Sequence, residues 1–411
     1  MQNTPRGLRL HIGIFGRRNV GKSQIINTLT NQDISIVSSV AGTTTDPVEK
    51  ALELLPLGPV LFVDTAGIDD EGDLGEQRIK KTYKIFDRTD LAIIVSDNHG
   101  WNSFEWQLYE EFKKRELPVI CVFNKTDLGK ISDSELKNLE EAGLKPLLIS
   151  AKYGDGVDRL IKTILELAPE EYINTPSIIG DLLPPGELAI LVVPIDLEAP
   201  KGRLILPQVQ TIRDILDNDS MTLVVKEREL RDAINRLNHP PAIVVTDSQA
   251  FLKVSADVPK NIKLTSFSIL FARFKGDLNE FVRGTLSIDS LKTGDKVLIC
   301  ESCSHHAIGD DIGRVKIPRW ITQYTGTKLN FEHYSGHDFP DNLTDYKLII
   351  HCGACMTNRR EILSRIMLAK QAGVPITNYG LTIAYSLGIF ERALEPFPMA
   401  RYLYEQHKIN K

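Results

Sequence analysis

A glycine-rich segment near the start of the chain has the residue types and spacing that bind phosphate. It reads Gly16-Arg-Arg-Asn-Val-Gly21-Lys22-Ser23, and it lies between a predicted strand, LHIGIFG, and a predicted helix that begins at Ser23. Glycines let backbone N–H groups turn toward phosphate oxygens, a lysine ammonium neutralises the β and γ oxygens, and a serine hydroxyl binds Mg²⁺. The strand, loop and helix together predict a site for a nucleoside triphosphate and Mg²⁺.

Four further segments follow in the order expected of such a site. They are Gly42-Thr-Thr-Thr-Asp46, Asp64-Thr-Ala-Gly67, Asn124-Lys-Thr-Asp127 and Ser150-Ala-Lys152. Asp64 ends a predicted strand and can hold Mg²⁺ through water, while the Gly67 N–H can bind the γ-phosphate. We predict Thr44 as the switch residue that binds Mg²⁺, with Thr43 and Thr45 as alternatives.

The Asn124-Lys-Thr-Asp127 segment predicts which base is bound. A carboxylate accepts hydrogen bonds from the N1–H and the amine of guanine, whereas adenine lacks that pair of donors. We therefore expect Asp127 to select GTP over ATP, Asn124 to brace the loop, and the stem of Lys125 to lie over the purine. Ser150 and Ala151 complete the predicted site, with a backbone N–H near Ala151 bound to the guanine O6 carbonyl.

These segments resemble those of the Era and TrmE-like GTPases. The resemblance covers residues 8–168 through GRRNVGKS, GTTTD, DTAGI, NKTD and SAK. It implies that four residues take part in GTP hydrolysis: Lys22, Thr44, Gly67 and Asn19. In several relatives the residue at Asn19 helps to bind a K⁺ that stimulates hydrolysis. Ile68 stands where other GTPases carry a water-orienting Gln, so water must be oriented otherwise, and Thr45 departs from the Arg usual in relatives.

Cysteines form a second group of candidate ligands. Of the five cysteines, Cys121 lies alone in the apolar strand PVICVF and is predicted to be a small core residue. The others form two pairs, each at the end of a predicted strand: Cys300 with Cys303, and Cys352 with Cys355. Parallel α/β sheets place ligands at the carboxyl ends of their strands, so the pairs could meet. Four thiolates suit zinc and iron–sulfur clusters alike, and the spacing does not choose between them.

Histidines beside these cysteines open a mixed ligand set. The order Cys303-Ser-His305 and then His351-Cys352-Gly-Ala-Cys355 resembles the C-x-H…H-C-x-x-C signature of the HydF family of [FeFe]-hydrogenase maturation GTPases. The resemblance implies a [4Fe–4S] cluster on Cys303, Cys352 and Cys355, whose fourth iron takes an exchangeable ligand. His305 and His351 are candidates for that ligand or for hydrogen bonds around the cluster, and Asp310, Asp311 or water are alternatives. Cys300 lies outside the signature, as a buried strand residue or a fourth thiolate.

The resemblance also implies a function and partners. A member of this family is a scaffold or carrier that receives a transient di-iron subcluster through radical-SAM maturases and delivers it to apo [FeFe]-hydrogenase. GTP hydrolysis would act as a conformational switch. An RNA- or ribosome-associated GTPase of the Era and TrmE type, with a structural zinc, is the alternative. A metabolic enzyme that merely uses GTP has no catalytic constellation in the sequence.

The elements that position these residues predict an α/β protein of three domains. Apolar strands alternate with helical segments up to about residue 168, which predicts a doubly wound P-loop GTPase domain over residues 1–170. After a polar, proline-containing linker, residues 171–264 form a small α/β module that the resemblance identifies as a dimerisation domain. Residues 265–411 form the predicted α/β cluster-binding domain, with one helix over FARFKGDLNEFVRG and strands at KVLIC and YKLIIHC.

Composition narrows the classes of partner. The 411 residues carry a formal net charge of −5, so no global field attracts nucleic acid, and no nucleic-acid partner is expected. No apolar run approaches the roughly 20 residues that span a bilayer, and the first residues lack the apolar core of a signal peptide. We expect a cytoplasmic protein without a membrane partner, and a homodimer.

Overall fold

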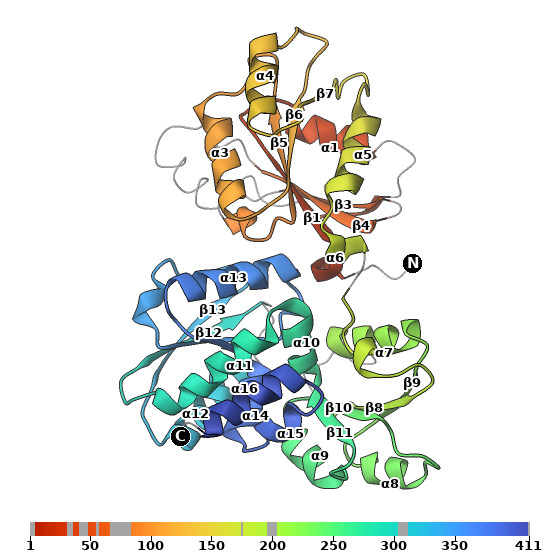
Figure 1. Ribbon diagram of the computed structural model, residues 1–411, viewed down its shortest axis with the longest axis vertical. Helices are drawn as coiled ribbons and strands as arrows, with labels where there is room; N and C mark the ends of the chain where they lie inside the picture. Colours follow the sequence, from red (N-terminus) through yellow and green to blue (C-terminus); the bar gives the residue numbers. More distant parts are fainter. Residues whose placement is uncertain are drawn as a thin grey trace. The chain divides into compact units, whose positions relative to one another are not determined.

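The computed structural model describes residues 5–30, 36–40, 48–54, 57–65, 84–173, 176–194, 204–302 and 311–409. The chain divides into two compact units, an N-terminal unit over Met1–Thr175 and a C-terminal unit over Pro176–Lys411 (Figure 1). The division falls within the predicted linker. None of the helices in these described ranges is long and apolar enough to cross a membrane.

The N-terminal unit is built on one seven-stranded sheet with the order β2-β3-β4-β1-β5-β6-β7. The strands are β1 (Leu10–Phe15), β2 (Ile36–Val40), β3 (Val48–Leu54), β4 (Gly58–Asp64), β5 (Leu91–Ser96), β6 (Val119–Phe123) and β7 (Leu147–Leu148). β3 is antiparallel to β2 and β4, and the remaining neighbours are parallel. The carboxyl ends of β1, β4, β5 and β6 therefore lie at one edge, where the predicted nucleotide segments begin.

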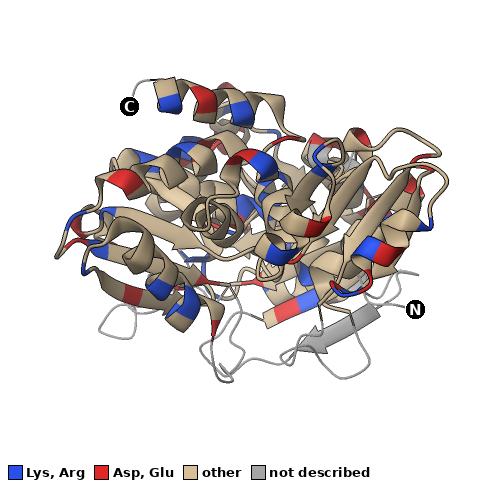
Figure 2. Ribbon diagram, turned by 90° about the horizontal axis from the view of Figure 1, so that it is seen from below, with Lys and Arg blue, Asp and Glu red and all other residues tan. Residues whose placement is uncertain are grey.

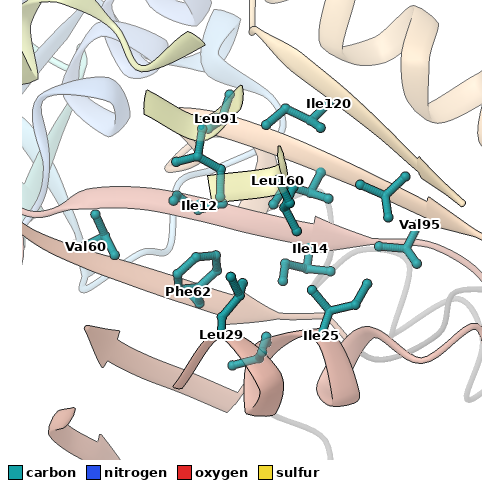
Figure 3. Close-up of a cluster of buried hydrophobic side chains, with 14 of the residues drawn as sticks. Ile12, Ile14, Ile25, Leu29, Val60, Phe62, Leu91, Val95, Ile120 and Leu160 are labelled. Atoms are coloured by element: carbon teal, nitrogen blue, oxygen red, sulfur yellow. The ribbon is translucent and has the colours of Figure 1, made fainter. Parts of the chain in front are cut away.

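Helices cover both faces of this sheet. They are α1 (Lys22–Thr30), α3 (Ser103–Lys114), α4 (Asp133–Glu141), α5 (Val157–Leu167) and the short α6 (Glu170–Ile173). Side chains of α1 and α5 pack on one face with Ile12, Phe62 and Leu91 (Figure 3), while α3 and α4 pack on the other. Strands buried on both faces read as continuous apolar runs, which is why β1, β5 and β6 were recognisable in the sequence. Cys121 is a buried core residue of β6, as predicted.

The C-terminal unit contains two four-stranded sheets, both entirely parallel. The first has the order β11-β10-β8-β9 and the second β13-β12-β14-β15. Their strands are β8 (Leu188–Val192), β9 (Met221–Val225), β10 (Ile243–Thr246), β11 (Lys263–Ser266), β12 (Lys296–Glu301), β13 (Asn330–Ser335), β14 (Leu348–His351) and β15 (Ile376–Asn378). The α/β class is thus confirmed in every sheet.

Ten helices surround these two sheets within the described residues. They are α7 (Leu206–Asp217), α8 (Leu230–Asn235), α9 (Phe251–Asp257), α10 (Phe267–Lys275), α11 (Leu278–Leu286), α12 (Ile317–Thr325), α13 (Arg359–Gln371), α14 (Tyr379–Ser386), α15 (Phe390–Ala393) and α16 (Pro398–Ile409). α10 follows the last strand of the first sheet and packs on α7, α13 and α14. Figure 2 shows Lys and Arg interspersed with Asp and Glu on the ribbons of that view.

One predicted element is wrong in its continuity. FARFKGDLNEFVRG is not a single helix, because α10 ends at Lys275 and α11 begins at Leu278. Gly276 favours a helix end, and the Asp277 side chain accepts hydrogen bonds from the N–H groups of Asn279 and Glu280 as the N-cap of α11. The last residue of α10, Lys275, contacts Thr357, which lies two residues after Cys355.

Candidate functional site

The phosphate-binding segment forms a tight loop between β1 and α1. Gly16 and Gly21 have φ angles of 145° and 95°, and Asn19 has a φ of 63°. A β-carbon on Gly16 would lie 2.2 Å from the Val95 carbonyl oxygen, and one on Gly21 would lie 2.3 Å from the Asn124 side-chain nitrogen. Both glycines are therefore required by backbone conformation and by close packing.

The Lys22 ammonium and the Ser23 hydroxyl, which are the predicted phosphate and Mg²⁺ ligands of this loop, each donate hydrogen bonds to nearby groups. The buried Lys22 Nζ donates to the carbonyl oxygens of Gly16 and Arg17, each at 2.8 Å, which holds the ammonium over the loop. The Ser23 hydroxyl, at the first turn of α1, donates to the Asp64 carboxylate at the end of β4. Burial raises the pKa of Asp64, against the lowering effects of the Ser23 hydrogen bond and of Lys22. The two predicted Mg²⁺ ligands thus lie together, and a divalent cation would favour the ionised carboxylate.

The segments predicted to bind the base also meet. The buried Asn124 side chain donates to the Val20 carbonyl at 2.9 Å and accepts from the Ala151 N–H at 3.0 Å, so it braces two loops as predicted. The Ser150 hydroxyl donates to the exposed Asp127 carboxylate at 2.7 Å. Lys125 has a φ of 61°. Because the Ala151 N–H is bound to Asn124, its bond to a guanine O6 stays a prediction.

One residue of the loop has a partner that motif reasoning missed. Arg17 donates through Nε to the fully buried Glu105 at 2.7 Å, and through Nη2 to Ser96 and to the Gly100 carbonyl. The other Glu105 oxygen accepts from the Asn102 N–H at the start of α3. Arg17 therefore ties the phosphate-binding loop to β5 and α3. Arg17 stands at a position that the G-x-x-x-x-G-K-[ST] pattern leaves free, so the motif carries no signal for this contact.

Several predicted site residues lie outside the described residues. They are Thr44, Gly67, Cys303 and His305, together with the neighbours Ile68 and Asp310. Their roles stay predictions.

The described cysteines of the C-terminal unit lie where the strand order reverses. β12 and β14 are the central neighbours of their sheet, with connections that leave on opposite sides, and ligands of open α/β sheets bind at the carboxyl ends of such a pair. The Cys352 N–H donates to the Cys300 carbonyl oxygen at 2.9 Å, and the Ser302 N–H donates to Cys352 Sγ at 3.1 Å. Ser302 is the last described residue before Cys303, and it lies beside Cys352.

We call residues 352–357 the cysteine loop. Ala354, between the two cysteines, has a φ of 55°, and its carbonyl oxygen accepts from the Thr357 hydroxyl at 3.3 Å. This turn places Cys355 near Cys352. Burial, and then the nearby Cys352, raise the pKa of Cys355 to about 11, while Lys275 lowers it. A cation would therefore be needed to hold the Cys355 sulfur as a thiolate at neutral pH, and a metal would supply it.

His351 has partners at both ring nitrogens. Its Nδ1 lies 3.0 Å from the Cys352 carbonyl oxygen, and its Nε2 lies 2.7 Å from Arg365 Nη1. A carbonyl accepts and a guanidinium donates, so Nδ1 carries the hydrogen and Nε2 accepts. Burial and Arg365 lower the pKa of His351 to about 3, so the ring is neutral. Arg365 in turn donates to Glu361 at 2.8 Å and to the Gly336 carbonyl at 2.9 Å.

Cys300 and Asp311 are the remaining described candidates, and they differ in burial and in hydrogen bonding. Cys300 is fully buried in β12, and burial raises its pKa to about 12. Asp311 accepts from the Arg314 N–H at 2.7 Å as a helix cap. Within the described ranges, which omit residues 303–310, no group of three or more His, Cys, Asp or Glu side chains is arranged to hold a metal ion.

Comparisons with known proteins divide along the same units. Residues 11–125 match the model of a family described as 50S ribosome-binding GTPase. Residues 178–276 match the hydrogen maturase F dimerization domain, and residues 279–396 match the hydrogen maturase F tetramerization domain.

Similar curated proteins and solved structures cover part of the chain. A tRNA modification GTPase MnmE of Chromobacterium violaceum is 38% identical over 38% of this chain and 34% of its own length. The MnmE of a Synechocystis species is 31% identical over 58% and 49%. The chain thus spans between a third and a half of these relatives. The crystal structure of Aquifex aeolicus Era bound to GDP and AlF4⁻ is 22% identical, with a TM-score of 0.33, over 56% of this chain and 98% of that one.

Proposed function

Because this chain belongs to the hydrogen maturase F family and carries a GTPase domain, we propose that it is a GTP-hydrolysing scaffold for hydrogenase maturation. It would receive a di-iron subcluster through radical-SAM maturases and deliver it to apo [FeFe]-hydrogenase. The observation that carries the proposal is the bond from the Ser302 N–H to Cys352 Sγ. Ser302, the residue before Cys303 in the sequence, thus lies beside the sulfur of Cys352, on the same polypeptide as a predicted nucleotide site.

The cysteine loop fits a [4Fe–4S] cluster. Cys352 and Cys355 lie in one tight turn, and Ser302 contacts the Cys352 sulfur. Cys303, Cys352 and Cys355 would hold three irons through their thiolates. Bound in this way, the cluster would keep one iron open to an exchangeable ligand, through which cargo can be held. Cys300 stays a core residue, because it is fully buried and its thiol is hard to ionise.

The fourth ligand is not taken from His351 in this proposal. The lone pair of its Nε2 accepts from Arg365, and its other nitrogen donates to the Cys352 carbonyl. The ring therefore orients the backbone that carries a cysteine ligand, as hydrogen-bonded groups around metal sites commonly do. His305, Asp310 or water remain candidates for the exchangeable position.

The N-terminal unit would bind GTP and Mg²⁺ through the loops described above. Lys22 would neutralise the β and γ oxygens, Ser23 and Asp64 would hold Mg²⁺, and Asp127 would bind the guanine. Thr44 and Gly67 would contact the γ-phosphate and lose that contact after hydrolysis. Such a release changes the conformation of switch segments, which is how GTPases exchange partners.

Asn19 would bind a stimulating K⁺. Its side chain is exposed beside the phosphate-binding loop, where an amide oxygen is a suitable ligand for a hard cation. Replacing K⁺ by Na⁺ at constant ionic strength is expected to slow GTP hydrolysis, and Asn19→Ala is expected to remove the difference between the two ions. Equal rates in both salts for the unaltered chain would exclude a K⁺ role.

A second copy of the chain would pack against the edge strand β9 and helix α7 of the first sheet. β9 is an edge strand, with backbone groups available for pairing, and exposed apolar side chains lie along it and on α7: Val209, Leu216, Met221 and Val224. This surface lies within the match to a dimerization domain. α7 also packs on β9 of its own sheet, so only its exposed side chains would face a second copy.

The decisive experiment combines metal analysis with a cysteine variant. Anaerobically prepared protein is expected to hold about four irons and four acid-labile sulfides per chain. Simultaneous replacement of Cys303, Cys352 and Cys355 by Ser should abolish this iron and the activation of apo-hydrogenase, with the GTPase rate retained. One zinc and no sulfide would instead support the alternative of an RNA-associated GTPase, which rests on the N-terminal unit alone.

A further inference from the structure

A buried lysine lies beside the cysteine loop without a role in the function proposed above. Lys275 is the last residue of α10 and is 2% exposed. Its Nζ donates to the Thr357 carbonyl oxygen at 3.1 Å, two residues after Cys355. The Nζ also lies 5.4 Å from the centre of the Phe274 ring, so contacts from α10 and from the cysteine loop both hold the buried ammonium in place.

Two further hydrogen bonds run in the opposite direction, from the start of α13 to the end of α10. Arg359, at the start of α13, donates through Nη1 to the carbonyl oxygens of Phe274 at 2.7 Å and Gly276 at 3.3 Å. These carbonyls belong to the carboxyl end of α10, where the helix dipole favours cations. The stretch from Thr357 to Arg359 is therefore fixed to the end of α10 by three bonds, one donated by Lys275 and two donated by Arg359.

The Lys275 ammonium also lies close to a proposed cluster ligand. Its Nζ is 3.1 Å from the Thr357 carbonyl oxygen, two residues after Cys355, and Lys275 and Thr357 are both buried, so water screens its charge little. A thiolate-bound iron–sulfur cluster is an anionic centre, and each electron it accepts adds a negative charge. A nearby cation stabilises the reduced form more than the oxidised form, because net charge and hydrogen bonding set cluster potentials.

We propose that Lys275 is a positioning residue of the cluster site, which fixes the cysteine loop to α10 and raises the reduction potential of the bound cluster through its positive charge. The inference rests on the proposed function, because it requires a cluster on Cys352 and Cys355. It assigns Lys275 no contact with the irons and no proton transfer.

The test is a redox titration of the full-length, iron-loaded chain. Lys275→Met removes both the charge and the hydrogen bond, Lys275→Gln removes the charge and keeps a donor, and Lys275→Arg keeps both. Arg273→Met is the matched control, since it removes a cation from the same helix that pairs with Asp181 instead of the loop. Each variant is titrated with a one-electron reductant, and the reduced cluster is followed by electron paramagnetic resonance.

We expect the Met and Gln variants to have more negative midpoint potentials than the unaltered chain, and the Arg variant and Arg273→Met to match it. Iron loss from both neutral variants with retention in the Arg variant also supports charge compensation. A Gln variant with full iron and an unchanged potential would overturn the inference, and so would iron loss from the Arg variant. Where Lys275→Met fails to fold, the Gln variant decides. If the unaltered chain binds no iron–sulfur cluster, the proposed function itself fails.

Discussion

At the scale of single residues, a buried hydrogen bond between His351 and Arg365 lies next to the cysteine loop. The Arg365 guanidinium is 3% exposed and is shared between His351, Glu361 and the Gly336 carbonyl. A buried charge that loses a partner costs more than the bond itself contributed. His351→Ala is therefore expected to destabilise the C-terminal unit by about 2–4 kcal/mol. Urea unfolding followed by circular dichroism measures this, with the exposed His239→Ala as control.

The same variant tests whether His351 is a ligand. We expect His351→Ala to keep its iron, and pulsed electron paramagnetic resonance of the reduced cluster to show the same nitrogen couplings before and after the change. Loss of a strong nitrogen coupling in the variant would instead place the imidazole on iron. Arg365→Met gives an independent check, because it frees Nε2 and is expected to let a histidine coupling appear.

Asp127 is expected to determine nucleotide choice through hydrogen-bond direction. A carboxylate accepts from the N1–H and the amine of guanine, whereas xanthine has a carbonyl in place of that amine. Asp127→Asn supplies a donor, so GTP affinity is expected to fall about 100-fold while xanthosine triphosphate affinity rises. Competition binding with the two nucleotides measures the exchange. Ser150→Ala, which removes one bond to this carboxylate, is the milder companion and is expected to weaken GTP binding about 3- to 10-fold.

At the scale of elements, strands with a regular apolar pattern could be predicted from the sequence. Side-chain hydrogen bonds between residues far apart in the sequence could not. β1, β5, β8 and β10 are mostly apolar and almost fully buried, whereas β13 reads NFEHYS, lies at a sheet edge and is only half-buried. Motif spacing likewise selected Lys22, Asn124 and Cys352 as candidates. The bonds of Lys275 to Thr357 and of Arg17 to Glu105 join residues 82 and 88 positions apart, and nothing local in the sequence signals them.

The apolar side of α7 and β9 can be tested as an interface between copies. Leu216→Glu combined with Met221→Glu puts two charges where a second copy is proposed to pack, and desolvating an unpaired charge there is costly. We expect the assembly to shift to a smaller species in light scattering after size-exclusion chromatography. Leu252→Glu on α9 is the control, because Leu252 and Leu216 are similarly exposed, at 52% and 54%. Equal masses for all three proteins would place the interface elsewhere.

At the scale of the whole molecule, the two compact units each hold one of the two groups of candidate residues. All described contacts of Lys22, Asp64 and Asn124 lie within the N-terminal unit, and those of Cys352 and His351 lie within the C-terminal unit. Nucleotide binding and cluster binding are therefore expected to be separable by mutation. Hydrogenase activation should need both, because the proposed function uses GTP hydrolysis to change partners and the cluster to hold the cargo.

Lys22→Met separates these requirements from the nucleotide side. It removes the ammonium that would stabilise charge developing on the phosphate oxygens, so the GTPase rate is expected to fall at least about 100-fold. Because Lys22 lies outside the C-terminal unit, the iron content and the midpoint potential of the cluster should not change. Apo-hydrogenase activation should be lost, and the unaltered chain with a non-hydrolysable GTP analogue should show the same loss. Full activation by Lys22→Met would mean that cargo delivery does not need GTP turnover, and would confine the nucleotide to a structural role.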